Sequence, residues 1–313
     1  MGRRISATSL CGSKMINKQE IITPIFLFNY TGKVDVDRLF IDKYEFNILE
    51  PPEDFNFSDN ILFLKKFDID SIADNIDWEF FSPYEKSTMK EAKWAITFYT
   101  DGDDVDIYTL KVNLLLLAIR IRFNSNCLIK YRLCKNNLRH SRRLANTFMP
   151  SIPDLRSKES YKIDELKTVD KTYIQILKLF DISFRGSNAL DFMYRGYNEY
   201  YAMTSFLLFT TALESFYLPY EYVKIGETLK ERITKFINDS SIANPSSINR
   251  LYSLRSDIIH GKIKSNIKLK DILPKISELH KILNRTVEKI IDDNLIEVIY
   301  KDEDSKENYF NSL

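Results

Sequence analysis

The stretch LYSLRSDIIHGKIKS (251–265) holds the residues of this chain best suited to chemistry on a phosphodiester. It contains Arg255, Ser256 and His260, and His260 is one of only three histidines. A guanidinium stays charged and offers a planar fork of donors to a phosphate, whereas an imidazole can move a proton near neutral pH. Ser256 could orient the imidazole or contact the phosphate. An arginine and a histidine could therefore act together on a phosphodiester bond.

The same residues also fit an ordinary helix end. A basic residue in the last turn relieves the negative end of the helix dipole, and a glycine directly after it adopts the left-handed conformation that closes a helix. His260 and Gly261 satisfy both rules. Ser256 could equally be a surface serine, and Asp257 could hold Arg255 in place or simply be solvated. Spacing alone leaves both interpretations open.

Cofactor and metal sites are not indicated. The chain has eight glycines and neither a GxGxxG nor a GxxxxGK[ST] arrangement, so a glycine-rich phosphate loop is not expected. Cys11, Cys127 and Cys134 are too few and too widely spread for a disulfide framework or a four-thiolate zinc site. His140 and His280 lack any ligand spacing. We therefore expect no cofactor and no metal.

Cysteine usage and hydropathy favour a cytoplasmic protein that does not contact a membrane. Three scattered cysteines are typical of reduced thiols. The longest apolar runs, such as 114–119, fall well short of a membrane span.

The second half of the chain shows helical periodicity. Apolar residues recur at three- and four-residue steps over 187–218, 226–239, 246–261 and 269–293, and Pro219 ends the first of these stretches. We expect an all-α bundle of four or five helices over residues 160–313. Residues 302–308 are predicted to form a solvated tail.

The first half reads as a mixture of strands and helix. Short aromatic and β-branched runs predict strands within 24–30, 38–48, 60–67, 93–100 and 126–137, and the apolar stretch 107–123 predicts a buried helix. Residues 149–160 have a linker composition. The predicted fold class is α+β, with an N-terminal mixed α/β domain over 1–150, of sensor or regulatory type, followed by the helical domain over 160–313.

Charge is unevenly distributed although the net charge is only +1. Residues 34–106 hold 19 acidic and 7 basic side chains, whereas residues 107–153 hold nine basic side chains and no acidic one. The two stretches could neutralise each other, or the second could meet an anionic partner. The segment 250–281, around Arg255, has eight basic and three acidic residues. This surplus suits RNA binding through counterion release.

Three segments together resemble the HEPN superfamily, in particular its Apea-like branch. They are Ala212-Leu213-Glu214, the helical segment 229–236, and the run from Arg255 to Gly261, which carries Ser256 and His260 at the family spacing. The resemblance covers about residues 160–295. It implies a metal-independent endoribonuclease that acts as a homodimer on tRNA or mRNA, together with a regulatory partner protein. The implied reaction is attack by the 2′-hydroxyl of the RNA, which leaves a 2′,3′-cyclic phosphate and a 5′-hydroxyl. Antiviral defence or stress-induced growth arrest is the implied outcome. Glu214 matches the family pattern and is expected to form a structural ion pair with an arginine.

Helix geometry bears on how such a site could work. Five helical steps place Arg255 and His260 about 140° apart and about 7.5 Å along the axis, so one helix does not easily aim both at one phosphate. A two-fold dimer could supply one group from each copy. The alternative is a non-catalytic dimerisation or RNA-binding module in a defence or toxin–antitoxin complex.

Overall fold

The computed structural model supports an α+β chain, as predicted. It describes residues 19–30, 41–44, 47–48, 54–71, 81–90, 92–100, 104–125, 127–129, 131–134, 142–143, 160–199, 201–219, 224–262 and 269–313. The chain forms two compact units, each of which has its own core. The first comprises Met1–Asn29, Asp42–Asn146 and Arg156–Ile174, and the second comprises Tyr30–Ile41, Thr147–Leu155 and Gln175–Leu313.

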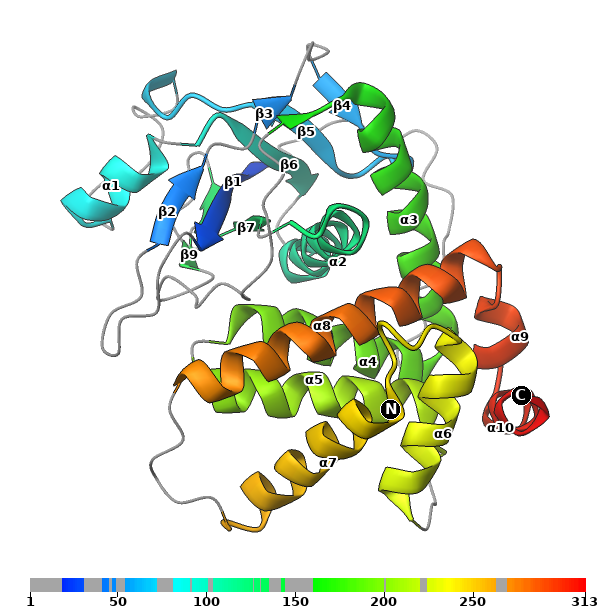
Figure 1. Cartoon of the computed structure of the whole chain (residues 1–313). Helices are drawn as coiled ribbons and strands as arrows, with labels where there is room; N and C mark the ends of the chain where they lie inside the picture. The colour runs from blue at the N-terminus through cyan, green and yellow to red at the C-terminus, as the bar shows by residue number, and fades with distance from the viewer. Residues whose placement is uncertain are drawn as a thin grey trace. The chain divides into compact units, whose positions relative to one another are not determined.

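The first unit is built around an antiparallel sheet (Figure 1). In the described part of the chain its main path runs β4-β5-β6-β1-β8-β9, and β2 and β7 also pair with β1. The long strand β1 is therefore the centre of the sheet; Ile22 lies opposite Thr97 of β6 and Leu133 of β8. The strands are β1 Gln19–Tyr30, β2 Ile41–Tyr44, β4 Asp54–Asn56, β5 Phe63–Lys66, β6 Trp94–Thr100, β7 Cys127–Ile129, β8 Tyr131–Cys134 and β9 Arg142–Arg143, with β3 Asn47–Ile48 paired to β10 Ser160–Tyr161.

Helix α2, Val105–Phe123, forms the core of this unit against β6 and β7. The unbroken apolar run 114–119 is buried on every side, which confirms the predicted buried helix. Asp104 occupies its N-cap position. Asp106, in the first turn, forms an ion pair with buried Arg132 at 3.1 Å. A short helix, α1 Pro83–Met89, precedes β6.

The boundary between the units falls inside helix α3, Ile163–Ile182, after Ile174. We expected the helical half to begin at residue 160. Side-chain bonds explain the later boundary: Tyr173 donates to Asp59 Oδ2 at 2.8 Å, and Thr172 Oγ1 accepts from Arg122 Nε at 2.6 Å. The start of α3 is thus part of the first unit's core. Apart from Ser160, the predicted linker lies outside the described residues.

The second unit is helical. Figure 1 shows α4 and α5 side by side with α8 across them, and both α4 and α8 contact α5. Each of the predicted helical stretches is confirmed, the first as two helices that meet around Glu199 and Tyr201. Besides the end of α3, the described helices are α4 Phe184–Asn198, α5 Ala202–Tyr217, α6 Ile225–Ile237, α7 Pro245–Ile259, α8 Leu269–Asp292, α9 Ile296–Tyr300 and α10 Glu303–Ser312.

The predicted solvated tail at 302–308 is wrong. Asp302 caps α10 by accepting from the Ser305 backbone N–H at 2.7 Å. Lys306 and Phe310 of α10 are buried. The Phe310 ring centroid lies 5.3 Å from that of Tyr217 and 5.7 Å from that of Phe236. These aromatic contacts join α10 to α5 and α6.

Candidate active site

Helix α7 carries the residues singled out by the sequence. Asn244 caps its start by accepting from Ser246 N at 2.9 Å, and Pro245 occupies the first turn, where a missing N–H costs nothing. Only Ile248 and Leu251 are fully buried in this helix. The side chains of its last two turns are therefore half-buried or exposed.

The C-terminal end of α7 has the geometry expected of a helix stop. Gly261 has φ +64°, Gly261 N–H donates to Ile258 O at 3.1 Å, and Lys262 N–H donates to Asp257 O at 2.9 Å. This pair of bonds is a Schellman motif, which only a residue tolerant of the left-handed region can close. The helix-end interpretation of Gly261 is confirmed.

Arg255 points back toward α5 and meets Glu214. Its Nη2 lies 3.1 Å from Glu214 Oε1 and donates to Oε2 at 3.2 Å. The two side chains are 21% and 10% exposed, so the pair is largely desolvated and the arginine side chain keeps the larger exposure. The expected structural role of Glu214 is confirmed, and its partner is the candidate catalytic arginine. Asp257, the alternative we considered, makes no ion pair with Arg255 among the described residues.

Glu214 sits at the buried end of α5. Burial raises the pKa of its carboxyl group, and the charge and hydrogen bond of Arg255, with the charge of Arg185, act in the opposite direction. Arg185 also donates to the main-chain oxygen of Glu214 at 3.1 Å. Both the side chain and the backbone of Glu214 are thus held by arginines.

His260 is exposed at the C-cap of α7, one residue beyond exposed Ile259. Its backbone N–H donates to Ser256 O at 3.0 Å. Among the described residues no side-chain hydrogen bond joins Ser256 to His260 or to Arg255. The structure therefore brings Arg255 to Glu214 and leaves Ser256 and His260 available. Within one copy, Arg255 faces the helical core whereas His260 faces solvent.

The other candidate residues have structural roles or lie outside the described part. Buried His280 bonds Tyr197 through Nδ1 and Asn284 through Nε2, which fits the absence of ligand spacing. Cys127 is buried, and burial raises the pKa of its thiol to about 11, which makes it a poor nucleophile. His140 and Cys11 are outside the described residues. No described group of three His, Cys, Asp or Glu side chains could hold a metal ion.

Four side chains that the sequence analysis did not single out converge on the last turn of α5. Arg185 and Lys306 donate to Ser215 O at 3.3 and 2.9 Å. Tyr300 donates to Phe216 O at 3.2 Å, and Arg232 donates to Tyr217 O at 2.8 Å. These groups satisfy carbonyls that a helix C-terminus leaves without partners. Only Arg232 carried a sequence signal, because it lies within the segment 229–236.

The basic surplus around Arg255 is partly neutralised. Lys275 lies 3.8 Å from Glu278. Arg250 donates to Ser247 Oγ at 2.6 Å and keeps its charge. Arg250 and Lys262 remain exposed on either side of Arg255. Two exposed cations near the motif are compatible with a phosphate track.

Comparison with known proteins adds no family: no family model matches the chain, and no curated protein or solved structure does. In the described ranges, every helix is too short or too polar to cross a membrane.

Proposed function

We propose that this chain is a metal-independent endoribonuclease of HEPN type that cuts tRNA or mRNA in the cytoplasm, in antiviral defence or stress-induced growth arrest. The observation that carries the proposal is the arrangement on α7. Arg255 is oriented by a desolvated carboxylate yet 21% exposed, and His260 stands free in solvent at the helix end. A fixed cation and a free proton carrier are the two groups that 2′-hydroxyl attack requires.

Each residue has a distinct part in this reaction. Arg255 holds negative charge on the scissile phosphate, and Glu214 fixes its guanidinium. His260 takes the proton from the 2′-hydroxyl or gives one to the leaving 5′-oxygen. Ser256, which is half-buried, contacts the phosphate or the imidazole. No metal or cofactor takes part.

The active unit is a homodimer. Arg255 turns inward and His260 outward on α7, so one copy does not present both groups to one phosphate. A second copy packed on the C-terminal end of α7 would cover Ile259, which is 51% exposed, and pair each arginine with the other copy's histidine. The first unit and a regulatory partner protein would restrain or recruit this dimer.

The rival function is a non-catalytic dimerisation or RNA-binding module in a defence or toxin–antitoxin complex. A specific observation favours it. The ion pair with Glu214 gives Arg255 a structural role, and the Schellman motif gives Gly261 one. In that case His260 is only a solvated helix cap.

An RNA cleavage assay in excess EDTA distinguishes the proposed ribonuclease from the non-catalytic module. Purified protein should cut total RNA and leave 2′,3′-cyclic phosphate ends, and His260→Ala should abolish cutting. Because His260 is exposed, this variant should unfold at the same urea concentration as the parent. Lys235→Ala, which removes an exposed cation of α6, is the control and should still cut. Undiminished cutting by His260→Ala, or none by the parent, would establish the rival.

Mixing inactive variants tests the shared site. We expect Arg255→Ala/Glu214→Gln and His260→Ala to be inactive separately and to regain cutting after unfolding and refolding together. One site of the mixed dimer then has an intact arginine and an intact histidine. If each copy were self-sufficient, no mixture would recover activity.

A further inference from the structure

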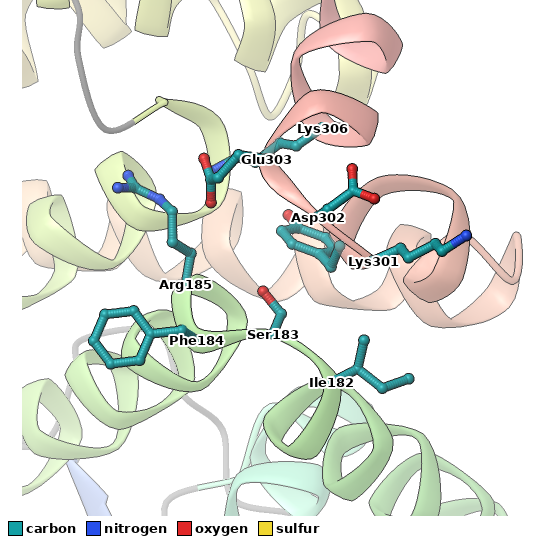
Figure 2. Close-up of a pocket in the computed structure, with 9 residues that line it drawn as sticks. Ile182, Ser183, Phe184, Arg185, Lys301, Asp302, Glu303 and Lys306 are labelled. Atoms are coloured by element: carbon teal, nitrogen blue, oxygen red, sulfur yellow. The ribbon is translucent and has the colours of Figure 1, made fainter. Parts of the chain in front are cut away.

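A pocket of about 180 Å³ lies between the start of α4 and the junction of α9 and α10 (Figure 2). It belongs entirely to the second unit and is separate from Arg255 and His260. Its walls carry both charged and apolar side chains. The lining residues are Ile182, Ser183, Phe184, Arg185, Tyr300, Lys301, Asp302, Glu303 and Lys306.

Lys306 is the unusual group in this pocket. It is 1% exposed, and its ammonium donates to Ser215 O at 2.9 Å and to Leu218 O at 2.7 Å. An ammonium has three N–H donors, so one remains after these two bonds. No carboxylate in the described part of the chain lies within 4.0 Å of its nitrogen. A buried cation without an adjacent counter-ion is costly, and a bound anion would remove that cost.

The surroundings of Lys306 are also suited to an anion. Arg185 and Lys301 add two cations to the walls. Ser183 and Asp302 are N-caps of α4 and α10, so the first-turn N–H groups of two helices, which lack partners inside their own helices, lie at the pocket. Figure 2 shows the side chains of Arg185, Glu303 and Lys306 converging above Ser183.

Two carboxylates limit which anion fits. Asp302 is engaged as an N-cap through its bond to Ser305 N–H. Glu303 Oε2 is buried and accepts no hydrogen bond. It would repel a fully ionised anion but would accept a hydrogen bond from an acidic O–H. Inorganic phosphate keeps an O–H beside its charged oxygens throughout the neutral range, and a phosphate monoester keeps one only in the form present below its second pKa of about 6, whereas sulfate carries none.

We propose that this pocket binds a singly protonated phosphate group, either inorganic phosphate or the phosphate of a monoester. Lys306 and Arg185 bind its charged oxygens, and Glu303 accepts from its O–H. The site is independent of the proposed ribonuclease activity. Burial is the main cause that lowers the pKa of Lys306 to about 7, and the positive charges of Arg185 and Arg232 lower it further. The negative charges of Glu303 and Glu307 act in the opposite direction. Binding therefore weakens as the pH rises above 7, since the ammonium loses its proton.

Calorimetric titration of the whole protein with inorganic phosphate at pH 6.5 tests the proposal. We expect one phosphate per chain, binding of sulfate about tenfold weaker, and a loss of about tenfold or more in phosphate affinity in Lys306→Met. Lys235→Met, on exposed α6 surface, is the matched control and should bind like the parent. Absence of saturable binding, or equal affinity in Lys306→Met, would overturn the proposal.

Glu303→Gln provides a test that does not depend on how Lys306→Met folds. A glutamine removes the repulsion and offers an N–H, so sulfate should bind to this variant about as tightly as phosphate. A persisting preference for phosphate would overturn the role of Glu303 and with it the site. Titration with adenosine 5′-monophosphate as a second ligand distinguishes a monoester from inorganic phosphate as the ligand of the pocket. Tighter binding than phosphate points to a monoester, and equal or weaker binding points to the free ion.

Discussion

Arg255 is at once the candidate catalytic group and the partner of a buried carboxylate, and this double role decides how it can be tested. Its guanidinium contacts Glu214, which is buried, and burial already raises the pKa of the Glu214 carboxyl group. Removing the arginine therefore removes a counter-charge as well as a phosphate ligand. Loss of activity in Arg255→Ala alone would not distinguish chemistry from stability.

We predict that Arg255→Ala lowers the free energy of unfolding by about 2 kcal/mol, because it leaves Glu214 buried without its cation. The double variant Arg255→Ala/Glu214→Gln should recover at least half of that loss, since the charge is removed with its partner. Urea unfolding of the four proteins in the cycle measures the coupling. Additive losses would mean that the ion pair contributes nothing.

Lys306 makes stability depend on pH in a defined direction. Its pKa falls from an ordinary 10.5 to about 7 in the folded chain. Between these values the unfolded chain binds a proton that the folded chain does not, so stability rises with pH through this window and the penalty is fully present below pH 7. We predict that the parent gains ~2 to 4 kcal/mol from pH 7 to 9.5 relative to Lys306→Met in urea unfolding. Parallel pH curves would contradict this prediction.

At the scale of the elements, the end of α7 sets where His260 stands. Gly261 has φ +64° and no atom within 4 Å of the position a side chain would take. A substitution there costs backbone strain without any clash. We predict that Gly261→Ala loses about 1 kcal/mol and that Gly261→Asn loses less, because asparagine tolerates the left-handed region. Thermal unfolding of both variants checks the order, and equal losses would show that the motif is not maintained.

Apolar periodicity predicted the elements that bury a continuous stripe. The buried helix at 107–123 and the helices at 226–239, 246–261 and 269–293 lie within a few residues of their predicted bounds. Helix α10 was not predicted because its composition is polar and only Lys306 and Phe310 are buried. A buried lysine gives no hydrophobic signal. The position of Lys306 is set by its hydrogen bonds to carbonyl groups at the end of α5, and a sequence pattern does not reveal such bonds.

The candidate site was predictable in its residues but not in its partners. The sequence predicted Arg255, Ser256 and His260 as site residues. It also predicted that Glu214 pairs with an arginine, but it did not indicate which arginine. Arg255 and Glu214 are 41 residues apart and meet because α5 and α7 pack together. The Schellman motif could be read from His260 and Gly261 because it depends on adjacent residues only.

At the scale of the whole molecule, the chain divides into two units, and one boundary between them in the sequence falls within α3, after Ile174. Predicting the split at 150–160 relied on composition, and composition does not record that Tyr173 bonds Asp59 of the first unit. A fragment designed to study the helical unit alone must therefore take into account that α3 belongs to the first unit up to Ile174. A cut at residue 160 would carry first-unit core residues into the fragment.

We predict that deletion of residues 302–313 destabilises the helical unit severely. It removes Lys306 from the Ser215 and Leu218 carbonyls, Glu307 from Arg232, and Phe310 from the aromatic cluster. The deletion should expose the protein to limited proteolysis across α5 and α6 at protease concentrations that leave the parent intact. A truncated chain as resistant as the parent would mean that α10 is dispensable. Deleting only residue 313 is the control.

The carbonyls that end α5 are satisfied by side chains that arrive last along the chain. Lys306 and Tyr300 are translated after α5, α6, α7 and α8. The end of α5 therefore lacks these partners until the segment 300–306 has been synthesised. Since domains fold as their sequence emerges, the last turns of α5, which carry Glu214, become fixed later than the order of the helices in the chain would suggest.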